Sequence, residues 1–185
     1  MEQQKEVEMK IKVTEEQAHK LQETLTEYGS ISEMTERDIY FTAPVRDFLE
    51  TNECLRIRVR DNEPVELTYK GKTTPEMQDQ FWKDEIDIPI DDVEDVRHIL
   101  KAIGCQELTT VVKHRQKVVE DSMVITLDDV EGIDHYLEIE SAATTPEEVT
   151  KARENNRTLL GELGIDSPEI VDEPYRDLVL ECQQN

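Results

Sequence analysis

The chain has 185 residues, of which 36% are apolar and 35% charged, and its formal net charge is −23, so it suits a single domain with a sizeable core. A charge of this sign argues against nucleic acid as a partner, because phosphate backbones are bound by basic faces, and it fits either salt adaptation or a soluble, monomer-favouring exterior. No apolar run approaches a membrane span, residues 1–5 offer no signal-peptide core, and the three cysteines form no C-x-x-C pair. We therefore expect a reduced, cytoplasmic protein with no membrane or nucleic acid partner.

The predicted elements begin with a strand at residues 6–13, where charged and apolar side chains alternate strictly. Thr14 follows, with Gln17 three residues on, and this capping-box pattern predicts a helix that ends at Gly29. The same two periodicities predict the remaining elements. We expect strands at 36–42, 53–60, 65–72, 82–90, 107–119, 123–128 and 135–141, helices at 91–103, 145–163 and 175–182, and a polar loop at 73–80.

A faint internal repeat relates residues 6–28 to residues 82–103, because each predicts a strand followed by an amphipathic helix. Three further strands follow each copy. Eight strands in two similar halves predict a closed or nearly closed antiparallel barrel. We therefore predict an α+β fold, an eight-stranded antiparallel β-barrel (tunnel) with a polar, charged interior and outer helices, formed by residues 1–185 as one domain.

Charged side chains occupy one face of most predicted strands, and 12 of the 21 basic residues lie within these strands. One interpretation is a solvated face over a buried one, the usual antiparallel arrangement. The helices, however, carry apolar stripes that need the apolar face of the sheet, which would turn the charged faces inward. Some faces are basic and others acidic, as a site for an anion and a cation requires.

These residue types indicate phosphoryl chemistry, because carboxylates suit Mg²⁺ or Mn²⁺ and guanidinium or ammonium groups suit phosphate oxygens. The candidate metal ligands are Glu6, Glu8, Asp128, Glu138 and Glu140, with Glu85 and Asp87 as secondary candidates. The candidate phosphate ligands are Lys10, Arg56, Arg58, Lys70, Lys72, Lys113 and Arg115.

Glu6-Val7-Glu8-Met9-Lys10 resembles the E-x-E-x-K signature of the CYTH superfamily, the triphosphate tunnel metalloenzymes. Within it the chain is most similar to the class IV adenylyl cyclase branch. The resemblance continues, in order, through Asp38–Phe41, Leu55–Arg58, Leu67–Gly71, Lys113-x-Arg115, Asp128–Glu140 and Tyr175–Leu178. One departure is Lys83-x-Glu85-x-Asp87, where many members carry Arg-x-Glu-x-Glu, and a lysine at position 83 lacks the bidentate phosphate contact of an arginine.

The resemblance implies a tunnel in which acidic residues hold Mg²⁺ or Mn²⁺ and basic residues hold a small-molecule triphosphate. In related triphosphatases the signature lysine works with a tyrosine to activate water, which makes Lys10 and Tyr40 the candidate catalytic pair. The implied reaction is the cyclisation of ATP to cyclic AMP and pyrophosphate. The alternatives are hydrolysis of tripolyphosphate, thiamine triphosphate or a nucleoside triphosphate, and non-catalytic binding of a nucleotide or polyphosphate. The motifs separate neither these reactions nor a monomer from a homodimer.

Overall fold

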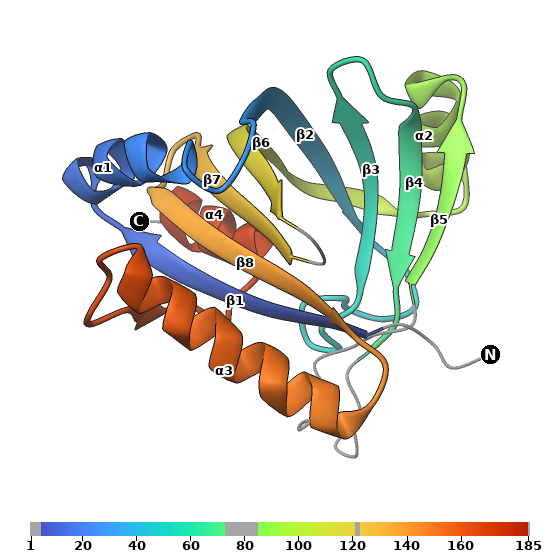
Figure 1. Cartoon of the computed structure of the whole chain (residues 1–185). Coiled ribbons are helices and arrows are strands. Elements are labelled where there is room, and N and C mark those ends of the chain that lie inside the picture. The colour runs from blue at the N-terminus through green and yellow to red at the C-terminus, as the bar shows by residue number, and fades with distance from the viewer. Residues whose placement is uncertain (1–4, 73–84, 121–122, 185) are drawn as a thin grey trace. The chain divides into compact units, whose positions relative to one another are not determined.

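The structure is a computed structural model that describes residues 5–72, 85–120 and 123–184, with the backbone alone at Lys5 and Glu6. The described residues form nine strands in one antiparallel sheet, together with four α-helices (Figure 1). The elements are β1 (Lys5–Val13), α1 (Glu15–Leu25), β2 (Ser32–Thr42), β3 (Cys54–Arg60), β4 (Val65–Lys70), β5 (Glu85–Ile90), α2 (Val93–Ala102), β6 (Gln106–Glu120), β7 (Met123–Val130), β8 (His135–Ala143), α3 (Pro146–Glu162), β9 (Glu169–Ile170) and α4 (Tyr175–Gln184).

The strands are hydrogen-bonded in the order β5-β4-β3-β2-β6-β7-β8-β1-β9. The predicted α+β fold class is confirmed, and each of the eight predicted strands is present. The ninth, β9, has two residues and pairs with β1 through Ile11 and Ile170, and it is too short to show a period in the sequence. The predicted loop at 73–80, Lys83 and the start of the predicted strand at 82–90 lie outside the described residues.

Both predicted capping boxes are confirmed. The Thr14 hydroxyl accepts a hydrogen bond from the backbone N–H of Gln17, and the Gln17 side chain accepts one from the N–H of Thr14. Thr145 and Glu148 are paired in the same way at the start of α3. The predicted end of α1 at Gly29 is wrong, because residues 26–28 bond to carbonyls three residues back and so tighten into a last turn beyond Leu25. No helix of the described segments has the length and apolarity to cross a bilayer.

The chain divides into two compact units. The first comprises Met1–Glu33, His114–Val130 and Asp134–Asp172, and the second comprises Met34–Lys113, Glu131–Ile133 and Glu173–Asn185. Because the boundaries fall within β2 and β6, each of these strands contributes residues to both units.

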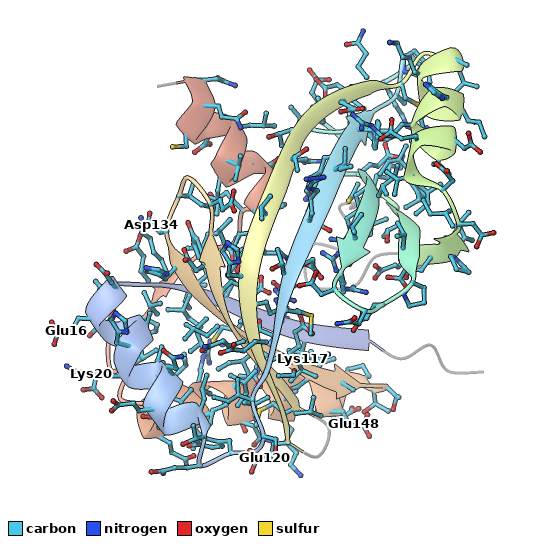
Figure 2. The ribbon with its side chains drawn as sticks, turned by 90° about the horizontal axis from the view of Figure 1, so that it is seen from above. Glu16, Lys20, Lys117, Glu120, Asp134 and Glu148 are labelled. Carbon is cyan, nitrogen blue, oxygen red and sulfur yellow. The ribbon has the colours of Figure 1, made fainter. Side chains whose placement is uncertain are left out.

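The core of the first unit lies between one face of β1, β7 and β8 and the helices α1 and α3 (Figure 1). The ladder aligns Met9 with Ile139 and Ile139 with Ile125, so these side chains share a face. Leu21 and Leu159 from the two helices pack against it. The outer face of α1 is polar, and Glu16 and Lys20 form an exposed ion pair there (Figure 2).

The core of the second unit uses the same arrangement with a different helix. Ile39 and Ile57 pair across β2 and β3, and Leu100 of α2 packs against them. Figure 1 shows α2 beside β4 and β5. In both units the helices therefore cover the apolar face of the sheet, as their apolar stripes predict, and the charged residues of these strands lie on the opposite face.

Candidate functional site

The charged face of the first unit brings together predicted metal and phosphate ligands from two adjacent strands. In the ladder between β1 and β8, Glu8 is opposite Glu140 and Lys10 is opposite Glu138. Directly paired residues of an antiparallel ladder share a face, so all four lie on the side away from the helices. Only the backbone of Glu6 is described, and it pairs with Ala142 one step further along.

Most charged side chains of this face are shielded from solvent. Lys10 and Glu138 are 7% and 6% exposed, and Asp128 of β7 is 0% exposed. Glu140 is half-buried, whereas Glu8 is exposed. Charged groups are buried to this extent only where other charges or hydrogen bonds compensate them, so these residues form an interacting network.

Arg115 joins the predicted phosphate ligands to the predicted metal ligands. It donates from Nε to Asp128 Oδ1 over 2.7 Å and from Nη2 to Asp128 Oδ2 over 2.5 Å. The same Nη2 donates to Glu138 Oε2 over 2.7 Å. Guanidinium and carboxylate match in shape as well as charge in such bidentate pairs, which makes them strong and directional.

The donor set of this face suits a hard divalent cation. Carboxylate oxygens are the ligands that Mg²⁺ and Mn²⁺ prefer, and like charges directly opposite in a ladder, as at Glu8 and Glu140, destabilise it unless a cation lies nearby. Within the part of the chain that the structure describes, no three His, Cys, Asp or Glu side chains are arranged to hold a metal. The residue types fit a divalent metal, although two of them contact Arg115.

The charged face of the second unit is built on β2, β3 and β4. The register places Asp38 opposite Arg58, and Arg58 opposite Glu66. One step further along, Tyr40 is opposite Arg56. The predicted basic residues of β3 therefore alternate with the acidic and phenolic residues of β2 across one surface.

Two buried carboxylates bind these cations. Arg58 donates from Nε to Asp38 Oδ1 and from Nη2 to Asp38 Oδ2, both over 2.6 Å, and its Nη2 is 2.8 Å from Glu36 Oε1. Arg60 donates from Nε to Glu36 Oε2 over 2.7 Å. Lys113 Nζ contacts Glu36 Oε1 and lies 3.8 Å from Asp38 Oδ2. Asp38 and Glu36 are 0% and 1% exposed.

The electrostatics of this network favour ionised Asp38 and protonated Tyr40. Burial alone would raise the pKa of Asp38, but the nearby Arg58 and Arg56 guanidiniums outweigh it and hold that pKa well below its usual range. Burial, and then the charge of Asp38, raises the pKa of the Tyr40 phenol. The Tyr40 hydroxyl accordingly donates to Asp38 Oδ2 over 3.3 Å.

Arg56 and Lys70 are bound less closely than Arg58 to the buried carboxylates of Asp38 and Glu36. Arg56 is 3.6 Å from Asp38 and 4.0 Å from Glu85, and its buried Nε has no hydrogen-bond partner among the described residues. Lys70 Nζ is 2.9 Å from Glu85 Oε2. Asp87 instead accepts a hydrogen bond from Thr68, so one secondary candidate contacts the cations and the other does not within the described residues.

The structure separates Lys72 from this network. Strand β4 ends at Lys70, not at Lys72 as predicted, and Lys72 is exposed beyond the strand end. Lys10 and Tyr40, the predicted catalytic pair, belong to the first and second units respectively.

The sequence interpretation assigned no role to Glu36, Asp38 or Arg60. The alternation of side chains along the strand could have identified the two acids, because Glu36 and Asp38 lie on the same face as Tyr40.

The residues at the start of α4 were also given no role by the sequence. Lys113 Nζ lies 5.1 Å from the ring centroid of Tyr175, and the next residue, Arg176, donates from Nη1 to the backbone carbonyl of Glu53 over 2.7 Å.

Comparison with known proteins agrees with this architecture. The chain is 33% identical over 175 residues to a Methanocaldococcus jannaschii protein named "Putative adenylate cyclase", covering 94% of this chain and 97% of that protein. A solved Pyrococcus horikoshii protein superposes with a TM-score of 0.79 at 35% identity, covering 95% of this chain and 98% of that one. An adenylyl cyclase candidate from Hippeastrum, described as having a dominant triphosphatase activity, has the same fold at a TM-score of 0.66 and 18% identity, covering 97% and 96%.

The CYTH domain model matches residues 4–175, which include parts of both units. This match and the archaeal relative confirm the resemblance that the ordered motifs indicated, and the superposed structures confirm the predicted fold class. The chain belongs to the CYTH domain family.

Proposed function

We propose that this protein is a divalent-metal-dependent enzyme that acts on a small-molecule triphosphate, with cyclisation of ATP as its first candidate reaction. The observation that carries the proposal is the buried charged face of the second unit, where four cations share two carboxylates. Those cations are Arg56, Arg58, Arg60 and Lys113. Arg60 also pairs with Glu63 and Glu66, and Arg56 with Glu85, so the face carries no excess of positive charge. The grouping of these cations and their shielding from water would strengthen their attraction for a polyanion.

Phosphate binding is proposed for the cations least bound to carboxylates. Arg56 and Lys70 both contact Glu85, at 4.0 and 2.9 Å, so a phosphate group could replace this partly exposed carboxylate. Arg58 also has two N–H groups on Nη1, which its contacts to Asp38 and Glu36 do not use. Lys113, Lys10 and Arg115 complete the proposed set, and Lys72 is its weakest member because it is exposed.

Metal binding is proposed for the acidic face of the first unit, through Glu8, Asp128, Glu138 and Glu140, with Glu6 of the same strand face. Mg²⁺ or Mn²⁺ bound there would neutralise charge on the phosphate oxygens during the reaction. Arg115 contacts both Asp128 and Glu138 and so holds the two carboxylates in place. Family membership and the archaeal relative's name support an enzyme rather than a silent binder.

In the cyclase reaction the ribose 3′-oxygen forms a bond to the α-phosphorus, the bond to the bridging oxygen breaks, and pyrophosphate leaves. The 3′-hydroxyl proton must be transferred to a base. The raised pKa of Tyr40, whose hydroxyl donates to Asp38, argues against Tyr40 as that base. For the hydrolytic alternative, which the Hippeastrum protein's described activity supports, Lys10 and Tyr40 remain the proposed pair for orienting water.

The deciding experiment incubates the pure protein with ATP, tripolyphosphate or thiamine triphosphate, each with Mg²⁺ or Mn²⁺, and identifies the products. Cyclic AMP together with pyrophosphate supports the cyclase. Orthophosphate alone overturns the cyclase and supports the hydrolase. Binding without turnover of any of the three would leave only the non-catalytic binder.

The three cysteines are all free thiols, which supports a reducing, cytoplasmic compartment.

A further inference from the structure

We propose that Asp38 and Glu36 are positioning residues, which fix the guanidinium of Arg58 in the orientation that binds phosphate. The inference rests on the proposed function, since it assumes that a phosphate is the ligand of Arg58. Neither carboxylate would touch the reacting atoms, and both would act through this arginine.

The geometry of Arg58 supports this role. Asp38 occupies the edge of the planar guanidinium formed by Nε and Nη2, and Glu36 contacts the same Nη2. None of these three contacts uses Nη1. A guanidinium held by one edge keeps the direction of its remaining N–H groups fixed, and a flexible side chain gains most from such fixing.

Burial of the carboxylates separates positioning from simple neutralisation. Asp38 and Glu36 are almost inaccessible to water, so neither can exchange its arginine for a water molecule without a large cost. Lys113 lies between them and already supplies a compact positive charge. Neutralising charge with Lys113 needs no particular geometry. The bidentate pair with Arg58 does, because it fixes the direction in which the guanidinium points.

The two roles predict opposite effects when the negative charge of Asp38 is removed. If Asp38 only supplies charge, its loss makes the site more positive and leaves catalysis intact. If Asp38 positions Arg58, its loss leaves anion binding as strong or stronger, while the reacting phosphate is misplaced and turnover falls. The comparison of kcat with KM therefore tests the inference directly.

The test uses Asp38→Asn and Asp38→Glu, with Glu107→Gln as the matched control. Glu107 accepts a bidentate pair from Arg97 at 2.8 and 2.9 Å in the same unit, but on an exposed surface. We expect Asp38→Asn to lower kcat by about 10²-fold. KM for the triphosphate, and the Kd for tripolyphosphate from calorimetry, should stay the same or fall. Glu107→Gln should change none of these quantities.

Wild-type kcat in Asp38→Asn, or a rise in KM alone, would overturn the inference. If Asp38→Asn does not fold, Asp38→Glu decides, because it keeps the charge and moves the carboxylate by one methylene. Its kcat should fall while its melting temperature remains close to the wild-type value, and an unchanged kcat would refute positioning.

A nuclear magnetic resonance measurement separates this inference from the proposed function. The Nε–H resonance of Arg58, assigned by its loss in Arg58→Lys, should be sharp in the wild type and broadened in Asp38→Glu. That result stands even if the wild type turns over no triphosphate, which would refute the function alone. A resonance that stays sharp in Asp38→Glu would refute positioning whatever the protein catalyses.

Discussion

Arg115 lies along the carboxylate of Asp128, with Nε 2.7 Å from Oδ1 and Nη2 2.5 Å from Oδ2. In the other unit, Arg58 lies along Asp38 through the same two atoms, with both distances 2.6 Å. A glutamate contacts the same Nη2 in each case. Each unit therefore fixes one arginine by one edge, and each arginine lies among the residues proposed to bind a metal or a phosphate.

Arg115→Met should make the protein depend on a divalent metal for its stability. Removing the guanidinium takes away the charge that both Asp128 and Glu138 contact, and breaking such a buried pair costs about 3–5 kcal/mol. Mn²⁺ bound by these carboxylates would restore part of that loss. Thermal unfolding with and without Mn²⁺ should show a larger stabilisation by Mn²⁺ in Arg115→Met than in the wild type. Equal stabilisation in both proteins would mean that these carboxylates serve Arg115 and not a metal.

Glu8→Ala should abolish metal-dependent turnover and leave the fold intact. Glu8 is exposed, so its removal should change the free energy of unfolding by only about 0.5 kcal/mol or less. The activity should fall by about 100-fold or more if it orients the reaction through the metal. Glu16→Ala on the outer face of α1 removes another exposed glutamate and serves as the control (Figure 2). Unchanged turnover in Glu8→Ala would refute its assignment as a metal ligand.

Asp38 should make the protein less stable in acid. Its pKa in the folded state lies below the value of about 3.9 expected in the unfolded chain, so the unfolded chain binds the proton more readily. The stability that Asp38 contributes is present above about pH 4 and is lost as the pH falls toward the folded pKa. Denaturant unfolding as a function of pH should therefore show a shallower acid decline in Asp38→Asn. Parallel curves for the two proteins would contradict this.

Ile139→Ala should test the helix-covered face of the first unit. Ile139 is 0% exposed and lies among α1, α3 and the neighbouring strands, so its truncation should cost about 2–5 kcal/mol of unfolding free energy. Ile170 in β9 is 52% exposed, and Ile170→Ala should cost much less. Urea denaturation of both variants measures the difference. Similar values would mean that the face is not closed by the helices as described.

Much of the architecture was predictable because it depends on local pattern. Strict alternation in residues 6–13 predicts the two faces of β1, and the structure confirms them in the pairing of Met9 with Ile139. The capping boxes depend on residues three positions apart, so Thr14 and Thr145 were visible in the sequence as helix starts. Family motifs in the correct order predicted the fold that the comparisons confirm.

One error is local, and the others concern contacts between residues that are distant in the sequence. The end of α1 was misplaced because its last residues form a tight turn before Gly29 rather than continuing to it. Strand β9 exists only because Ile11 is available for pairing, which no property of residues 169–170 indicates. Glu36 and Asp38 were given no role because their partners are on another strand.

The sequence by itself determined which residues share a strand face, because side-chain direction alternates with the backbone and needs no knowledge of neighbours. It also determined the chemical types on each face, and so predicted metal and phosphate ligands. Only the tertiary structure decided which charges meet. Arg115 reaches Asp128 and Arg58 reaches Asp38 because of strand order and register, and a shift of one residue would turn each side chain to the other face.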